Sequence, residues 1–236
     1  MDRGVLGSES FAGLPSLSVA AHELKSPIAL MRQLSLAVLE EDLSDEQRSR
    51  LKQMVATADR SLRLVTDLSH VSNLQSALFP IEPVNPLAVC QTIVSEMRPI
   101  ARLYGHGITW VPSRSNALVV ANRHLLGRVV SNFLDNALKY TEQGAPIRLS
   151  VSRIRDSVRV SVRDYGPRMS NIEYRRLLGE LETKKTVKSR PNSSGLGIFL
   201  ASEFARTMHG QIGLTRHRDG VTFYVELPVS RQMSWL

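Results

Sequence analysis

The sequence contains a single cysteine, Cys90, so no disulfide can form within the chain. A chain with so few thiols suits a reducing compartment. No apolar run approaches the roughly 20 residues that a membrane-spanning helix needs, and the N-terminus lacks the pattern of a signal peptide. We therefore expect no membrane segment in this chain and a cytoplasmic location, which would equally suit the soluble part of a membrane-anchored protein.

Negative charge is in short supply, because 30 Lys and Arg residues stand against 22 Asp and Glu residues and leave a formal net charge of +8. This excess favours an acidic partner or a polyanionic ligand. The basic residues are scattered, without a dense run or interleaved aromatic residues, so we do not expect the chain to bind nucleic acid. The length of 236 residues suffices for one large domain or two small ones.

The N-terminal third shows a helical apolar pattern. Residues 1–10 have no periodicity and are predicted to be a disordered start or a linker. A helix is predicted from about Phe11 to Glu41. Its apolar residues recur at alternating steps of three and four, interrupted only by Ser35, and they are Leu14, Leu17, Ala21, Leu24, Ile28, Met31 and Val38. This spacing predicts that the helix packs along a partner helix.

A second helix is predicted to begin after Ser44. Ser44 and Gln47 have the spacing of a capping box, and the apolar stripe that follows extends to about Ser76. Two helices with such narrow stripes bury little apolar surface alone. Residues 11–79 are therefore predicted to form an antiparallel hairpin that dimerises into a four-helix bundle.

The pattern changes after the Pro-rich segment 80–86, which is predicted to be a linker between two domains. Helices are predicted at 86–104, 123–140 and 195–208, and strands at 108–111, 117–121, 147–154, 158–162, 211–215 and 221–227. Residues 166–194 lack apolar periodicity, which predicts a mobile functional loop. Residues 87–236 are thus predicted to form a sheet covered on one face by helices.

Four short motifs stand in order along this pattern: AHELKSP at 21–27, NFLDNALKYT at 132–141, DYG at 164–166 and SGLGI at 194–198. Together they resemble the H, N, G1 and G2 boxes of the cytoplasmic core of two-component sensor histidine kinases. The segment 219–223 is similar to the last glycine box of that family. The resemblance covers nearly the whole chain from Phe11 and implies an α + α/β two-domain fold. A dimerisation and phosphotransfer hairpin would precede an ATP-binding α/β sandwich of Bergerat (GHKL) type, with residues 166–194 as its lid.

The second motif carries two amides at helical spacing. Asn132 and Asn136 are four residues apart, so both project from the same face of one helix. An unpaired amide would be expensive among their apolar neighbours, Val129, Val130, Phe133, Leu134 and Ala137, which favours a functional role over a solvated face. The resemblance assigns the magnesium ligand to Asn136, whose neutral amide oxygen suits a hard cation.

The resemblance further implies that ATP and Mg²⁺ are the cofactors. Lys139 would neutralise phosphate charge, and Asp164 would accept a hydrogen bond from the adenine amino group, with Thr222 supporting that end of the base. Gly195 and Gly197 would let the backbone approach phosphates at a helix N-terminus. The full set of ATP-binding residues predicted in this way is Asn132, Asn136, Lys139, Tyr140, Asp164, Gly166, Ser194, Gly195, Leu196, Gly197 and Thr222.

The same resemblance makes His22 the phosphoacceptor. It lies one residue past the apolar position Ala21, so its ring is expected on the solvated flank of the helix. Glu23 matches the residue that orients the imidazole and takes its proton. Lys25 and Ser26 stand where the family has a basic residue and a threonine linked to phosphatase chemistry. The implied partners are a second copy of the chain and the receiver domain of a response regulator, whose aspartate would take the phosphoryl group.

The glycine boxes depart from the family pattern. Gly166 is followed by Pro167 and Arg168 where the family has a second glycine, and the segment 192–194 is Asn-Ser-Ser where further glycines are usual. Two alternatives stay open. A GHKL ATPase of gyrase or chaperone type would need no His22, but Asn132 occupies the place of its water-activating glutamate. A non-catalytic or phosphatase-only relative, acting as a dimeric signalling scaffold, would tolerate the altered glycine boxes.

Overall fold

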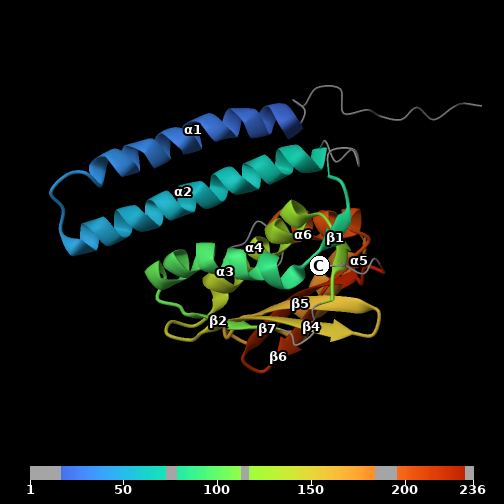
Figure 1. The fold of residues 1–236 in the computed structure, drawn as a ribbon. Coiled ribbons are helices and arrows are strands. Elements are labelled where there is room, and N and C mark those ends of the chain that lie inside the picture. Colours follow the sequence, from blue (N-terminus) through green and yellow to red (C-terminus); the bar gives the residue numbers. More distant parts are fainter. Residues whose placement is uncertain (1–16, 73–78, 113–116, 184–195, 232–236) are drawn as a thin grey trace, which may run out of the picture.

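The computed structural model describes residues 17–72, 79–112, 117–183 and 196–231. They form a pair of helices and a larger unit built on a β-sheet (Figure 1). We refer to the two helices as the helical hairpin and to the described residues of 79–231 as the sheet domain. The predicted disordered start at 1–10, the expected helix turns at 11–16 and 73–76, and most of the second half of the predicted lid lie outside the described residues.

The helical hairpin consists of α1 (Leu17–Val38) and α2 (Asp45–Ser72), which run side by side (Figure 1). The predicted capping box at the start of α2 is confirmed, because the Gln47 amide nitrogen donates to Ser44 Oγ and the Ser44 amide nitrogen donates to Gln47 Oε1. Arg32 of α1 and Asp59 of α2 form an ion pair at 2.6 Å that holds the two helices together. Among the described helices, none combines the length and apolarity that a bilayer crossing demands.

One side of α1 leaves large apolar residues in solvent. Leu30, Met31 and Leu34 each expose more than half of their surface. Of the predicted seam residues, Ala21 is fully buried, whereas Leu24 and Met31 are 50% and 55% exposed. Ser35, which interrupts the apolar pattern, is buried and satisfies its hydroxyl by donating to the backbone oxygen of Met31. The hairpin therefore buries only part of its apolar surface within one chain.

The sheet domain contains a five-stranded mixed sheet in the order β2-β4-β5-β7-β6. β2 and β4 are parallel and all other neighbours are antiparallel. The strand bounds are Ile108–Val111 (β2), Ile147–Ile154 (β4), Ser157–Arg163 (β5), Gln211–His217 (β6) and Gly220–Pro228 (β7). These strands agree closely with the predicted ones, and in β5 and β7 buried residues alternate with half-buried ones.

A small second sheet includes part of the segment that was predicted to be a linker. Within 80–86, β1 (Glu82–Val84) pairs antiparallel with β3 (Val119–Ala121). Pro83 lies opposite Val120, where its missing amide hydrogen is tolerated in a two-stranded sheet. Residues 82–84 are thus part of the sheet domain, and the prolines alone had suggested a linker.

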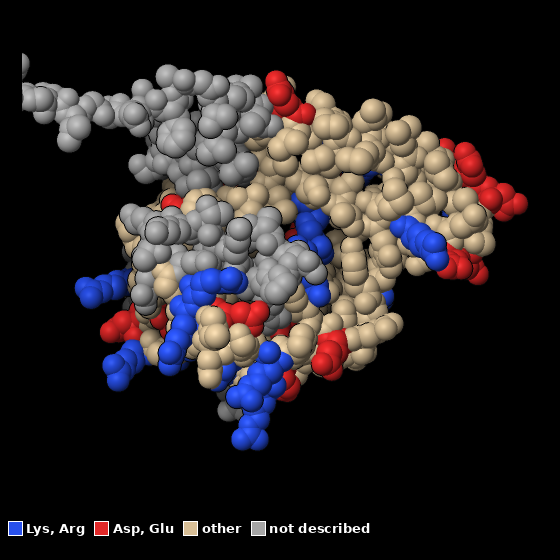
Figure 2. All heavy atoms as spheres, turned by 180° about the vertical axis from the view of Figure 1, so that it is seen from behind, with Lys and Arg blue, Asp and Glu red and all other residues tan. Residues whose placement is uncertain are grey.

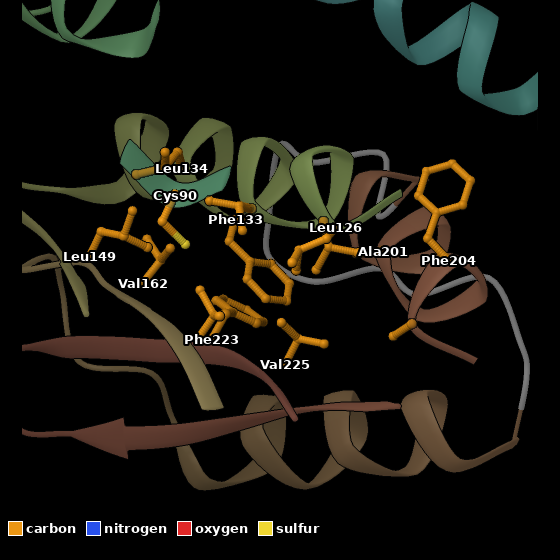
Figure 3. Close-up of a cluster of buried hydrophobic side chains, with 14 of the residues drawn as sticks. Cys90, Leu126, Phe133, Leu134, Leu149, Val162, Ala201, Phe204, Phe223 and Val225 are labelled. Atoms are coloured by element: carbon orange, nitrogen blue, oxygen red, sulfur yellow. The ribbon is translucent and has the colours of Figure 1, made fainter. Parts of the chain in front are cut away.

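Three helices cover one face of the large sheet: α3 (Pro86–Leu103), α4 (Arg123–Tyr140) and α6 (Leu196–Thr207). Asn85 and Asn122 cap α3 and α4 by accepting from backbone amides of the first turn. Between these helices and the sheet lies the core, in which Phe133 stacks on Phe223 at 5.8 Å and Cys90 is fully buried (Figure 3). The observed bounds of α4 match the prediction.

The predicted irregularity of the lid is wrong for its first half, which forms α5 (Asn171–Thr183). Ser170 and Glu173 make a capping box, with each backbone amide donating to the other residue's side chain. Leu177 is fully buried and anchors the helix to the core. The charged residues around Leu177 hid the apolar side of this helix in the sequence.

The sheet domain is docked against α2 through two ion pairs. Arg60 Nε donates to Asp135 Oδ1 at 2.9 Å, and both side chains are only 12–13% exposed. Arg128 Nε lies 3.0 Å from Asp67 Oδ1, whose side chain is 4% exposed. Two hydrogen bonds add to this interface, from Gln53 Nε2 to the Leu103 backbone oxygen and between Thr57 Oγ1 and the Tyr104 hydroxyl. Lys and Arg atoms are visible in the seam between the two units (Figure 2).

Candidate functional site

The two amides of α4 point into the sheet domain without satisfying all their hydrogen-bonding groups. Asn132 and Asn136 are 7% and 8% exposed, and among the described residues neither Nδ2 atom has a hydrogen-bond partner. The hydroxyl of Thr141, at the end of the same helix, is also buried without one in that part of the chain. Buried donors left unpaired cost about 1–3 kcal/mol each, so this cluster indicates a site for a polar ligand.

A buried carboxylate, that of Asp164, also belongs to the candidate site. Asp164, just after β5, is 1% exposed, and its Oδ1 accepts from the Val221 amide at 2.9 Å. Gly220 turns into β7 with φ +121°, and a Cβ atom there would lie 2.4–2.5 Å from Asp164 oxygens. The glycine of the last predicted box therefore holds the backbone of β7 against the aspartate of the G1 box.

Two other glycines bring the remaining motifs together. A Cβ atom on Gly166 would lie 1.9 Å from the backbone oxygen of Tyr140, so only glycine fits between the G1 turn and the end of α4. A Cβ atom on Gly197 would lie 3.4 Å from Asn132 Oδ1, which places the first turn of α6 directly beside that amide. Motifs separated by up to 65 positions in the sequence thus meet at one place.

Lys139 and the helix start complete the predicted set. Partial burial and the positive charge of Arg60 lower the pKa of Lys139, although Asp135 acts in the opposite direction. Leu196 and Gly197 form the start of α6 and are half-buried, as is Tyr140. Ser194 and Gly195 lie outside the described residues, so their predicted contacts with phosphate remain predictions.

Thr222 does not share a face with Asp164. It pairs with Arg163 and Thr215 across the sheet, and its Oγ1 is 2.8 Å from His217 Nε2. Since side chains alternate along β7, Val221 is the residue that lies on the helix-covered face beside Asp164. The predicted support of the base by Thr222 is therefore not favoured by the structure, and the strand alternation could have indicated Val221.

The departure at Arg168 causes no backbone strain. Among the described non-glycine residues, only Arg155 and His209 have positive φ angles. The chain therefore leaves β5 through Pro167 and Arg168 by a path that needs no second glycine.

A divalent cation at this site would be coordinated by the amide oxygen of an asparagine and by oxygen atoms of the bound ligand. No group of three or more His, Cys, Asp or Glu side chains suited to a metal occurs in the part of the chain that the structure describes. Asn136 is 8% exposed, and its neutral amide oxygen suits a hard cation that shares phosphate oxygens. The residues present thus fit Mg²⁺ bound together with a phosphate-bearing ligand.

The H motif lies on α1, apart from this cluster. His22 is exposed, as its position one residue past Ala21 had predicted. Glu23 and Ser26 are also exposed, and Lys25 is half-buried. Figure 1 shows α2 lying between α1 and the sheet domain. The structure therefore brings the nucleotide motifs together but leaves His22 on the other side of α2.

The nucleotide motifs of the sheet domain are typical of one class of ATPase. Residues 121–231 match the family described as histidine kinase-, DNA gyrase B- and HSP90-like ATPases. The sheet domain is thus similar to this class over residues 121–231, and the predicted GHKL type of α/β fold is confirmed.

Proteins that are similar over about 90% of this chain are sensor histidine kinases. The adaptive-response sensory kinase SasA of Rippkaea orientalis is 29% identical over 229 residues, which cover 91% of this chain and 58% of SasA. The swarming motility regulation sensor protein RssA of Serratia marcescens is 29% identical over 217 residues, or 89% of this chain and 45% of RssA. The crystal structure of full-length ShkA in complex with AMPPNP has 25% identity and a TM-score of 0.66, covering 93% of this chain and 47% of ShkA. These matches confirm the predicted resemblance to a sensor histidine kinase core, and the chain spans about half the length of these relatives.

Proposed function

We propose that this chain is the catalytic core of a sensor histidine kinase, which phosphorylates His22 from ATP and passes the phosphoryl group to an aspartate of a response regulator. The glycine contacts that bring the nucleotide motifs together, with the unpaired donors of Asn132 and Asn136, carry this proposal. An exposed histidine followed by a glutamate on a separate helix supplies the acceptor. The matching ATPase class and the sensor kinase relatives favour this function over a non-catalytic scaffold.

The nucleotide would be held at its two ends. Asp164 would accept from the adenine amino group, since its carboxylate is buried and held in place by the Val221 amide. The unpaired amides of Asn132 and Asn136 and the start of α6 would bind the phosphates, with Lys139 adding positive charge. Bound Mg²⁺ would be held by Asn136 and would neutralise phosphate charge.

His22 would then act as the nucleophile. A nitrogen of its neutral imidazole attacks the γ-phosphorus, the bond from that phosphorus to the ADP oxygen breaks, and Glu23 takes the imidazole proton. The phosphoryl group moves next to a carboxylate oxygen of the regulator and leaves His22 neutral again. Lys25 and Ser26 would face the regulator, where the serine hydroxyl could orient water for its dephosphorylation.

Phosphorylation requires the sheet domain to leave its docked position. α2 separates His22 from the nucleotide motifs, and the ion pairs of Arg60 and Asp67 hold the sheet domain on α2. This arrangement is accordingly a resting one, in which ATP bound to the sheet domain lies across α2 from His22 of the same chain.

The exposed side of the hairpin supports a homodimer. Leu30, Met31 and Leu34 are more than half exposed, and a groove of about 590 Å³ runs between α1 and α2 beside Ile28 and Met54. A second hairpin would cover this surface and form the predicted four-helix bundle. Residues 11–79 would be the dimerisation and phosphotransfer domain, and residues 166–194 would be the lid over the nucleotide.

Incubation with γ-labelled ATP and Mg²⁺ tests the proposal. The wild type should acquire a label that is labile in acid and stable in alkali, and His22→Ala should acquire none. His124→Ala, which removes another exposed histidine, serves as the matched control and should be labelled normally. Equal labelling of His22→Ala would refute the assignment, and ATP binding without any labelling of the wild type would favour the scaffold.

A further inference from the structure

A cavity of about 430 Å³ lies between α2, α3 and α4. Its floor consists of the buried side chains of Val89 and Met97, and half-buried Ile93 and Ile100 form its apolar wall. None of the residues assigned above to ATP or to phosphotransfer lines it. Its volume lies in the range of about 300–1,000 Å³ that small-molecule sites usually have, and such sites often lie between domains.

A glycine in the second turn of α4 opens this cavity. Gly127 is buried, and glycine inside a helix costs about 1 kcal/mol relative to alanine. The packing of α3 on α4 does not require it, because the nearest atom to an added Cβ would be Ile93 Cδ1 at an ordinary 3.5 Å. A side chain at this position would not clash with α3. The glycine therefore leaves space over α4 that a ligand could occupy.

The rim of the cavity is predominantly basic. Arg63 of α2 and Arg123, His124 and Arg128 of α4 line it, whereas Glu96 is the one acidic residue among the lining residues. Arg128 is partly compensated by its ion pair with Asp67, whose carboxylate also interacts with the charge of Arg63. The remaining excess of positive charge next to an apolar floor suits a molecule with an anionic head and an apolar body.

We propose that this cavity binds an organic anion with an apolar body, of the class of medium-chain carboxylates. The apolar chain would lie on Val89, Ile93 and Met97 over Gly127, and the carboxylate would lie among the arginines of the rim. Because Arg63 comes from the helical hairpin and the other residues come from the sheet domain, the bound anion also contacts both units at once. This inference does not depend on the proposed kinase activity.

Titration calorimetry of the whole chain with decanoate tests the site. The wild type should bind decanoate, and Gly127→Leu, whose side chain would fill the space over α4, should weaken binding at least tenfold. Gly179→Leu is the matched control, because it places the same side chain on helix α5 at a glycine with nothing within 4 Å of the added Cβ. This control should bind decanoate like the wild type.

The charge requirement is tested separately and does not depend on filling the cavity. Arg63→Gln should weaken decanoate binding about tenfold, whereas Arg98→Gln, which removes an exposed positive charge of α3 outside the lining, should leave it unchanged. Decan-1-ol, which has the same chain and no charge, should bind much more weakly than decanoate, and saturating ATP should not displace decanoate. Full binding by Gly127→Leu, equal binding of the alcohol, or displacement by ATP would each overturn the proposal.

Discussion

Replacing Arg60 by glutamine should release the sheet domain from α2. The change removes the hydrogen bond from Arg60 Nε to Asp135 Oδ1 and leaves a carboxylate that is only 13% exposed without its cation. It also removes the guanidinium from its place 5.8 Å from the centroid of the Tyr104 ring. Both contacts join α2 to the sheet domain, so their loss weakens docking and leaves each unit intact.

The size of the effect follows from these contacts. A hydrogen bond to a charged group contributes about 1.5–3 kcal/mol, and a partly exposed cation–π contact contributes about 0.5–1 kcal/mol. Because water reaches both members of the pair, we take about 2 kcal/mol for the sum. This free energy corresponds to roughly a thirtyfold shift of the docking equilibrium towards the undocked arrangement.

Small-angle scattering and the initial rate of His22 labelling report this shift. Arg60→Gln should raise both the radius of gyration and the rate, and Arg32→Gln is the matched control. Arg32 forms a similar ion pair with Asp59, but that pair lies within the hairpin. Arg60 also lowers the pKa of Lys139, so ATP affinity has to be measured in parallel. An unchanged radius for Arg60→Gln, or an equal rise in rate for Arg32→Gln, would refute the idea that docking restrains the kinase.

Three further predictions concern stability, nucleotide binding and assembly. Burial raises the pKa of Asp67 from 3.8 to about 6, so the wild-type free energy of unfolding should fall by up to about 3 kcal/mol as the pH rises from about 4 to 6. This fall should be absent from Asp67→Asn when the free energy of unfolding is measured by urea titration at each pH. The same pH dependence in the wild type and the variant would contradict the assignment of the fall to Asp67. Gly166→Ala places a Cβ atom 1.9 Å from the backbone oxygen of Tyr140 and should weaken ATP binding at least tenfold in calorimetry. Gly107→Ala, which has open space around the added Cβ, should bind ATP like the wild type. Equal ATP affinities of the two variants would argue against the role of Gly166. Leu34→Glu, at a residue 58% exposed on α1, should convert a dimer into a monomer in sedimentation, while Ile172→Glu, 80% exposed on α5, should not; a dimeric Leu34→Glu protein would exclude this face.

The elements with strong local signals could be predicted from the sequence. The bounds of α4 and β4 agree with the prediction, because apolar periodicity and an asparagine cap fix the first and alternation fixes the second. The start of α2 was equally predictable from Ser44 and Gln47. The meeting of the nucleotide motifs followed from their resemblance to a known set, and the glycine contacts of the structure now give it a steric reason.

Other features depend on contacts that leave little trace in the sequence. α5 was missed although Ser170 and Glu173 have capping-box spacing, because its apolar side is reduced to a few residues around Leu177. The docking pairs join residues 75 and 61 positions apart, and no periodicity relates such partners. Thr222 was assigned to the base because the motif includes it, whereas the pairing of β7 decides which face each side chain takes.

The burial of Cys90 gives the molecule an unusual chemical simplicity. The thiol is fully enclosed between α3 and the sheet, and burial raises its pKa to about 12, so it stays protonated at neutral pH. Thiolate, and not thiol, is the species that reacts with alkylating reagents. A cysteine introduced at an exposed position would therefore be the single reactive thiol of the folded chain. One such residue on α1 and another on the sheet domain would carry a pair of spectroscopic labels, and the distance between the hairpin and the sheet domain could be followed without first removing the native cysteine.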